Sequence, residues 1–336
     1  MAGEVRAQEV LAPPAEAAVF LVLTLRPGAE RTVHTALPDV AALTRSVGFR
    51  APDDTLSCVV GIGAAAWPRI YRLPRPAGLH PFRAITGARH TAVSTPGDLF
   101  LHVRSRRIDL CFELARRLLA TLAGAVDVVD EVHGFRYLGQ RDALGFAVGT
   151  DNPEGAAAVA AVTVGAEDPS YAGGSYVVVQ KYLHDLEAWR ALSVEEQERA
   201  MGRTKLGNIE LRDRAANSHV ALSRVVDANG RRRRIVRDQM AFGSVGAGEF
   251  GTYVASYAGT TDAIERILYN RYVGNPPGQY DRILDFSTAV TGTLFFVPTA
   301  DFLENPLVPA PGATSRSLPA GADGSLGIGS LRRSRT

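Results

Sequence analysis

Two segments of the chain follow the same pattern of strand, short polar turn and helix. They are GDLFLHVRSRRIDLCFELARRLL, beginning at Gly97, and GTYVASYAGTTDAIERILYNRYV, beginning at Gly251. In each, an apolar run typical of a buried strand precedes apolar residues at helical spacing. An internal repeat of this kind indicates a duplicated unit, so both halves of the chain are expected to share one plan.

Further strands and helices fit this plan. A helix is predicted over 192–203, where Ser193 and Glu196 form a capping-box signature. Strands alternate with helices, and antiparallel returns are expected, which favours an α+β fold of two ferredoxin-like units side by side. Residues 123–174 then form the long connection between the units, and a loop of this length is usually either functional or a wrong assignment. Further strands are predicted at 17–25, 56–63 and 175–185, and a last strand with a turn is predicted at 293–303.

The expected division of the chain has five parts. The first ferredoxin-like unit covers 1–130, a connection covers 131–174 and the second unit covers 175–304. Residues 305–324 are rich in Pro, Ala, Gly and Ser and are predicted to be a flexible linker. Residues 325–336 place regularly spaced apolar side chains after this tether, which is typical of a segment that docks into a groove; the alternative is a frayed end. Those apolar side chains are Leu326, Ile328 and Leu331.

Charge and composition exclude several classes of protein. The formal net charge of +2 argues against a nucleic-acid-binding surface. The two cysteines, Cys58 and Cys111, lie in apolar runs without metal-ligand spacing, so we expect buried thiols in a reducing compartment. The N-terminus lacks the pattern of a secretory signal. The longest apolar stretch, AAVFLVLTL, is too short to span a membrane. A soluble cytoplasmic protein is expected.

Residues 144–153, LGFAVGTDNP, form an unusual loop sequence. Gly145 and Gly149 indicate backbone with positive φ or a close approach to a bulky group. Val148 lies in the middle of this turn-forming segment, where a hydrogen-bonding side chain would be expected. The loop is therefore a candidate for part of a functional site.

Three further motifs contain candidate functional residues. His219, in NSHVAL, is either a structural residue or a single axial ligand to a haem, which needs an acceptor for its other ring nitrogen. Arg237 lies in an apolar strand and must meet an anion there, either in a structural ion pair or in a functional site. Asp281 and Asp285, in DRILDFSTAVTG, offer a helix cap and a carboxylate that supports a ligand. The patterns GXSXG, Walker A and GXGXXG are absent from the sequence.

The motifs LGFAVGTDNP, NSHVAL, RDQMAFG and DRILDFSTAVTG occur in this order and strongly resemble those of the bacterial B-type dye-decolorizing peroxidases. The resemblance covers about residues 10–305. It implies a duplicated ferredoxin-like fold and a haem b cofactor. It also implies hydrogen peroxide as the oxidant and dyes, phenols or metal ions as electron donors. A homo-oligomer, either a dimer or a hexamer, is the expected assembly.

Specific residues match the family's motifs. By resemblance, His219 is the proximal ligand of the haem iron, and Asp281 is the carboxylate that hydrogen-bonds it, with Asp285 as the alternative. Arg237 matches the distal arginine, which would stabilise charge on the leaving oxygen. Gly149 and Thr150, in the same loop as Val148, match cofactor-binding positions.

Two positions depart from the family pattern. The family has an aspartate where this chain has Val148, and it usually has asparagine where this chain has Gln239. The aspartate can shuttle a proton between the peroxide oxygens, and loss of such a group typically costs roughly 10²–10⁴ in rate. Slow or altered peroxide activation is expected. The alternatives are a haem-binding protein without useful turnover, which Val148 favours, and a non-peroxidase relative of the same superfold. The presence of Arg237 favours peroxide chemistry.

The C-terminal sequence SLGIGSLRR resembles the peptide that loads such peroxidases into encapsulin shells. This resemblance implies an encapsulin shell protein as partner and a location inside a nanocompartment in the cytoplasm. Leu326, Ile328 and Leu331 would fill apolar pockets on the inner face of the shell.

Overall fold

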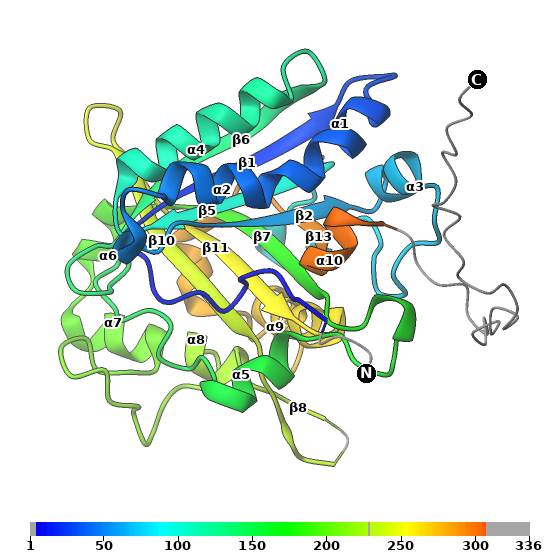
Figure 1. Cartoon of the computed structure of the whole chain (residues 1–336). Helices are drawn as coiled ribbons and strands as arrows, with labels where there is room; N and C mark the ends of the chain where they lie inside the picture. The colour runs from blue at the N-terminus through cyan, green and yellow to red at the C-terminus, as the bar shows by residue number, and fades with distance from the viewer. Residues whose placement is uncertain (1–4, 228, 307–336) are drawn as a thin grey trace, which may run out of the picture.

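The sheet of this protein closes on itself. In the computed structural model, which describes residues 5–227 and 229–306, the strands follow the order β11, β10, β6, β1, β5, β2, β13, β7, and β11 pairs again with β7 (Figure 1). Their bounds are β1 Ala17–Leu25, β2 Ser57–Gly63, β5 Leu99–Ser105, β6 Val126–Phe135, β7 Ser175–His184, β10 Val236–Ser244, β11 Glu249–Ala258 and β13 Thr293–Val297. The short strand β12, Ser287–Ala289, pairs with β7 outside this ring.

The two halves of the barrel have the same strand order. In the first half the order is β6, β1, β5, β2, which places its fourth strand next to its first, then its third and its second. In the second half β13, β7, β11 and β10 repeat this order. The halves join where β6 meets β10 and where β2 meets β13. The predicted pair of ferredoxin-like units is thus confirmed, and the repeat seen in the sequence corresponds to β5 with α4 and to β11 with α9.

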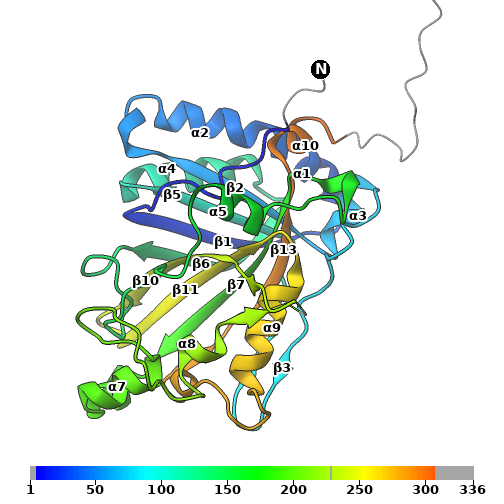
Figure 2. The ribbon, with the colours of Figure 1, turned by 90° about the horizontal axis from the view of Figure 1, so that it is seen from below.

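Helices cover the outside of the barrel, as Figures 1 and 2 show. The amphipathic helix α4 packs against β1 and β5 and buries Cys111, Leu114 and Leu118, as its helical spacing predicts, although Ile108 and Phe112 are exposed. The helices are α1 Glu30–Ala36, α2 Val40–Gly48, α3 Ala66–Tyr71, α4 Ile108–Thr121, α5 Gly155–Val162, α6 Leu186–Ala191, α7 Val194–Met201, α8 His219–Leu222, α9 Thr261–Tyr272 and α10 Ala300–Glu304.

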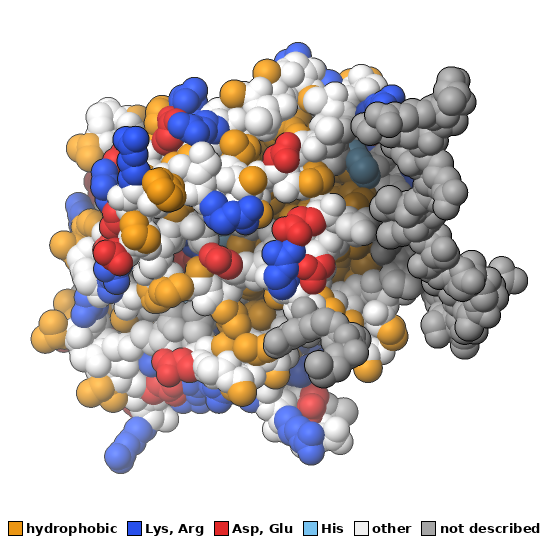
Figure 3. All heavy atoms as spheres, in the orientation of Figure 1, with side chains coloured by type: hydrophobic (Ala, Val, Ile, Leu, Met, Phe, Trp, Pro, Cys, Tyr) orange, Lys and Arg blue, Asp and Glu red, His pale blue; other side chains and the backbone are white. Residues whose placement is uncertain are grey.

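The period-two alternation of each strand separates two apolar layers. Side chains that point into the barrel, among them Phe20, Phe100, Tyr253 and Phe295, form one buried cluster. The outward faces pack under the helices in a second, larger cluster. On the face seen in Figure 3, positive and negative side chains are interspersed, which agrees with the nearly balanced net charge.

The expectation for residues 123–174 was wrong, because this segment contains β6 and α5. Strand β6 crosses the boundary expected at residue 130. Most of its residues are exposed, among them Val128 and Val129, so it lacks the apolar run that marks the other strands. Between β1 and β2 the chain forms α1, a single 3-10 turn that contains Pro38, and α2.

The remaining expectations concern the cap of α7, the two cysteines, membrane-spanning helices and the C-terminal segment. Helix α7 carries the predicted capping box of Ser193 and Glu196. Cys58 and Cys111 are both free thiols, but only Cys111 is buried as expected, and Cys58 is half-buried. Within the described ranges, no helix is long and apolar enough to cross a membrane. The docking residues Leu326, Ile328 and Leu331 lie outside the described residues, as do the tail 325–336 and nearly all of the linker.

Candidate active site

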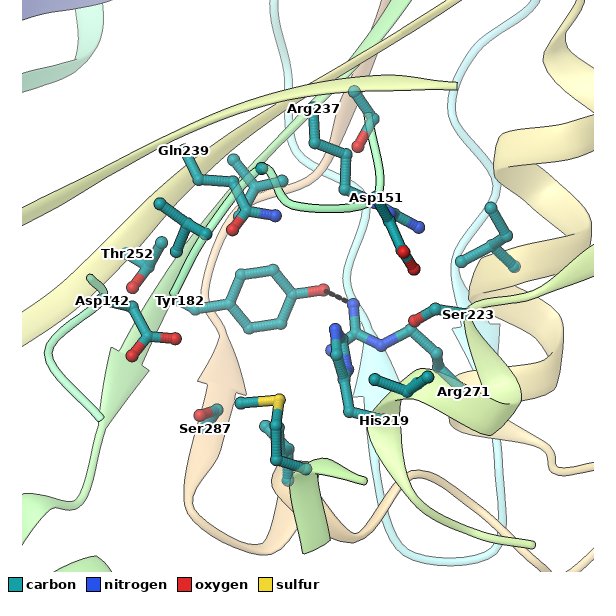
Figure 4. Close-up of a pocket in the computed structure, with 18 of the residues that line it drawn as sticks. Asp142, Asp151, Tyr182, His219, Ser223, Arg237, Gln239, Thr252, Arg271 and Ser287 are labelled. Atoms are coloured by element: carbon teal, nitrogen blue, oxygen red, sulfur yellow. Dashed lines mark hydrogen bonds between the residues drawn. The ribbon is translucent and has the colours of Figure 1, made fainter. Parts of the chain in front are cut away.

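A cavity lies between the outward face of the second unit's sheet and helices α8 and α9. It encloses about 1100 Å³ of empty space, part of it open to solvent (Figure 4). Its walls are mixed, because apolar side chains of α9 such as Ile264 and Leu268 face polar ones from the sheet. The sheet contributes Gln180, Tyr182 and His184 from β7, Arg237 and Gln239 from β10, and Thr252, Val254 and Ser256 from β11.

His219 begins helix α8 and presents its ring to the cavity. Its Nδ1 lies 2.8 Å from Oδ2 of Asp281, and 26% of its side chain is exposed, although the surroundings are desolvated. Burial lowers the pKa of His219, and the charge of Asp281 opposes this shift without reversing it. The ring is therefore neutral near pH 7. With Nδ1–H donated to Asp281, Nε2 keeps its lone pair, as a metal-binding imidazole requires.

Asp281 is fully buried and anchors this histidine. It caps a 3-10 turn by accepting the N–H of Ile283 at Oδ1, and its Oδ2 also accepts Nε–H of Arg271 at 2.7 Å. Burial acts to raise the pKa of Asp281, but His219 and Arg271 together lower it to about 2. Asp285, the alternative partner, instead contacts His90, Tyr280 and Arg282. The structure thus pairs His219 with Asp281.

Arg237 projects from β10 into the same cavity. Among the described residues no carboxylate lies within 4.0 Å of its guanidinium, so the structural ion pair weighed from the sequence is not present there. Burial and the nearby charge of Arg271 lower the pKa of Arg237 to about 10, which still leaves it protonated near pH 7. Its backbone is fixed by Asn152, whose side chain accepts the N–H at 2.9 Å and donates to the carbonyl at 2.8 Å.

The loop of residues 144–153 forms another wall of the cavity. Gly145 and Gly149 have φ of 90° and 72°, as the two glycines predict. Val148, Gly149 and Thr150 all line the cavity, as does Gln239 from β10. The position between the two glycines therefore faces the same space as Arg237 and His219, and it carries an apolar side chain.

Sequence reasoning missed several polar residues of the cavity. Asp151 lines it and forms ion pairs with Arg203 at 2.9 Å and Arg232 at 3.1 Å. His184 lines it with both ring nitrogens bonded, to Ser287 and Thr252, and burial lowers its pKa to about 4.

Asp142 and Arg271 were missed as well. Asp142 lines the cavity from the segment before the loop, and Arg271 reaches it from α9. Neither belongs to a spacing pattern that marks a site in sequence. In the folded chain Asp142 lines the same cavity as His219 and Arg237, and Arg271 shares the carboxylate of Asp281 with His219.

Comparison with known proteins gives consistent results. Family models described as Dyp-type peroxidase, N-terminal and C-terminal, match residues 7–136 and 139–302. The dye-decolorizing peroxidases of Rhodococcus erythropolis and Mycobacterium tuberculosis are each 54% identical to this chain, over 97% of it and 97% of their own length.

Solved structures agree with this. The encapsulated DyP-type peroxidase from Mycobacterium smegmatis, solved by cryo-EM, superimposes with a TM-score of 0.89 at 54% identity, over 91% of this chain and 100% of that one. DyPB from Rhodococcus jostii gives a TM-score of 0.87 at 50% identity, over 90% of this chain and 99% of its own. Variants of that protein have been solved in complex with heme.

Proposed function

This chain belongs to the Dyp-type peroxidase family, and on that premise we propose that it is a haem b peroxidase in which Arg237 activates hydrogen peroxide without a carboxylate at position 148. The observation that carries the proposal is the composition of one cavity. It holds a neutral histidine supported by a carboxylate, an arginine that forms no ion pair with any described residue, and a valine at the position of the family's acid.

The cavity residues fit a haem. The Nε2 atom of His219 is available as an axial ligand, and Asp281 fixes the ring orientation through Nδ1. The buried amide nitrogen of Gln180 has no hydrogen-bond partner among the described residues, as expected of a cavity that receives a further group. When bound, haem supplies the electron transfer between peroxide and the donor.

In the proposed reaction, Arg237 activates hydrogen peroxide. A guanidinium that has no carboxylate partner in the described cavity is available to stabilise negative charge that develops on a peroxide oxygen. Asn152 holds the backbone of Arg237 by two hydrogen bonds, so the side chain starts from a fixed point. Gln239 lies two residues after Arg237 on β10 and therefore on the same face of the strand. It offers an amide to the same space but cannot exchange a proton at neutral pH.

Val148 makes this peroxidase slow. Its side chain can neither take a proton from peroxide nor return it, and general acid–base groups typically contribute roughly 10²–10⁴ in rate. We therefore expect a working enzyme whose reaction with peroxide is slower than that of a relative with an acid at this position. Dyes and phenols are the proposed electron donors.

A rapid-mixing experiment tests the role of Arg237. The haem-loaded protein and the variant Arg237→Leu are mixed with hydrogen peroxide while the Soret absorption is recorded. The native protein should show a peroxide-dependent change, and the variant should react at least about 10² more slowly than the native protein, as for loss of one charge-stabilising donor. Equal rates would exclude a role for Arg237.

The second candidate is a haem-binding protein without useful turnover, which the apolar side chain of Val148 favours. Such a protein would keep an unchanged Soret band, or only lose absorption by bleaching, in the same experiment. A non-peroxidase activity on this superfold is not favoured, because two Dyp-type family models match the chain.

The C-terminal segment extends the proposal to an encapsulin shell. The relative from Mycobacterium smegmatis is an encapsulated enzyme, and SLGIGSLRR in this chain resembles a loading peptide. We expect the protein to co-purify with a co-expressed encapsulin shell, and to lose this association when residues 325–336 are deleted.

The expected assembly of the free protein is a homo-oligomer, either a dimer or a hexamer, and analytical ultracentrifugation tests it. The division into units at 1–130, 131–174 and 175–304 stays a prediction, although β6 crosses its first boundary.

A further inference from the structure

We propose that Asp142 exchanges protons with hydrogen peroxide in this cavity and so takes over part of the work of the carboxylate that is missing at position 148. The inference rests on the proposed peroxidase function. It concerns a side chain that the family motifs did not single out.

Asp142 and Val148 belong to one small antiparallel ribbon. Arg141 and Ala147 form a bridge pair, Asp142 N–H donates to the carbonyl of Phe146 at 2.9 Å, and Val148 N–H donates to the carbonyl of Gln140 at 2.9 Å. In this register Gln140 lies opposite Val148, and Asp142 is the diagonal neighbour of Val148 on the same face.

Diagonal neighbours on an antiparallel ribbon lie roughly 7–8 Å apart. The side chains of Asp142 and Val148 both line the cavity. In the view of Figure 4 the carboxylate of Asp142 lies on the same side of the cavity as Gln239 and Thr252. A carboxylate at this distance can reach a small ligand beside Val148 directly or through one water, which is the reach that general acid–base catalysis requires.

The surroundings of Asp142 leave it free to exchange a proton. One oxygen, Oδ1, accepts the N–H of Phe146 at 3.0 Å, and among the described residues no Lys, Arg or His nitrogen lies within 4.0 Å of the carboxylate. Burial raises the pKa of Asp142 to about 6, although the N–H groups of its turn and the charge of Lys205 act in the opposite direction. Its proton affinity is therefore close to that of an efficient acid–base catalyst at neutral pH.

The other charged groups around this end of the cavity have partners of their own. Lys205 donates to the side chain of Gln197, and Arg141 donates to the carbonyl of Gly145. His184 is neutral, since burial lowers its pKa to about 4. A rate that depends on ionisation near pH 6 would therefore report on Asp142.

Asp151 is the competing carboxylate, and its ion pairs exclude it. Burial would raise its pKa, but Arg203, Arg232 and Arg224 together lower it below the usual value. A carboxylate held by three guanidinium groups is a weak base and is not a proton donor near pH 7.

The proposed step moves one proton and returns it. The carboxylate of Asp142 accepts the proton that hydrogen peroxide loses from one oxygen, which forms the carboxylic acid. As the O–O bond breaks, the acid gives this proton to the other oxygen, which leaves as water with the electron pair of that bond. The reduction of hydrogen peroxide needs two electrons, and the electron donor of the peroxidase reaction supplies them through the haem. Asp142 is again a carboxylate at the end of the step.

A double-mutant cycle tests the inference. Asp142→Asn keeps an oxygen to accept the N–H of Phe146 and removes only the acid–base function, while Val148→Asp restores the family's acid. In the native background, Asp142→Asn should slow the Soret change with peroxide by roughly 10-fold or more. In the Val148→Asp background it should have little effect, because the restored acid carries the proton. Asp53→Asn, at an exposed aspartate outside the cavity, is the matched control.

Cyanide binding gives a second readout that needs no turnover. Hydrogen cyanide must lose its proton to bind ferric haem, so the binding rate of the native protein should rise with pH through about 6, and Asp142→Asn should abolish this inflection.

Two outcomes of the double-mutant cycle would overturn the inference. If Asp142→Asn slows the reaction with peroxide equally in the native and Val148→Asp backgrounds, the role of Asp142 is structural. No effect in either background would overturn it as well. If neither the native protein nor Val148→Asp reacts with peroxide, the proposed function fails, while the cyanide profile still decides the role of Asp142.

Discussion

His219 and Arg271 donate to the same carboxylate oxygen. Nδ1 of His219 and Nε of Arg271 lie 2.8 and 2.7 Å from Oδ2 of Asp281, which is fully buried. The carboxylate is therefore divided between a histidine that faces the cavity and a cation held on α9. Arg271 is itself oriented by Tyr182, whose hydroxyl accepts Nη1–H at 3.2 Å. This arrangement fixes the histidine and limits how much negative charge Asp281 can lend to it.

Replacement of Asp281 should weaken both the cofactor site and the fold. Asp281→Asn leaves Arg271 buried without its anion, and breaking a buried ion pair typically costs about 3–5 kcal/mol. Loss of a carboxylate that supports a ligating histidine typically costs roughly 10–100-fold in affinity for the metal group. Haem titration and urea unfolding of the haem-free protein measure the two effects. Asp285→Asn, on the same turn but away from His219, is the control and should leave haem affinity unchanged.

Asp142 should make the haem-free protein less stable as the pH rises. Its pKa is about 6 in the folded chain, against about 3.9 in an unfolded one, so the folded state binds more protons between these values. The contribution of Asp142 to stability is therefore present below about pH 4 and is lost as the pH rises through 6. Asp142→Asn removes this loss, and it should be more stable than the native protein by roughly 2 kcal/mol at pH 8 and equally stable at pH 4. Denaturant unfolding at both values measures this; a pH-independent difference would contradict the assigned pKa.

Asn152 should be required to hold Arg237 in place. Strand β10 pairs with β6 only at Ala241, so near Arg237 its outer edge is satisfied by the side chain of Asn152. Asn152→Ala leaves an N–H and a carbonyl of Arg237 unpaired, which should cost about 1–3 kcal/mol in the free energy of unfolding. The reaction with peroxide should slow as well, because the starting point of the guanidinium is no longer fixed. The variant Asn152→Asp keeps only the acceptor for the N–H of Arg237. Its free energy of unfolding and its rate with peroxide should both fall between those of the native protein and of Asn152→Ala.

Much of the fold could be predicted from the sequence because its strands are buried and apolar. The repeat of β5 with α4 and β11 with α9 predicted a duplicated unit, and the strand order confirms it. Strand β6 was missed because most of its side chains are exposed, so it carries no strong apolar run. Closure of the barrel through β11 and β7 depends on pairings between distant segments, which no local pattern encodes.

The site was predictable only where its residues lie in recognisable motifs. His219, Arg237 and the Asp281 position could be identified by family resemblance. The structure brings His219 and Arg237 to one cavity, and Asp281 is buried next to His219 as its hydrogen-bond partner. The resemblance preferred Asp281 and kept Asp285 as the alternative, and the hydrogen bond between His219 and Asp281 agrees with that preference. Asp142 and Arg271 could not be assigned from sequence, since their roles depend on the ion pairs they make or lack in the folded chain.

The measurement that tests the central claim most directly is the rate of reaction with hydrogen peroxide for the native protein and for Val148→Asp, both loaded with haem. Position 148 faces the cavity beside Arg237, so a carboxylate there should restore proton transfer. The account predicts a Soret change in the native protein and an increase in its rate by roughly 10–100-fold in the variant. A variant that reacts no faster than the native protein would show that the missing acid does not limit this peroxidase, and it would contradict the account.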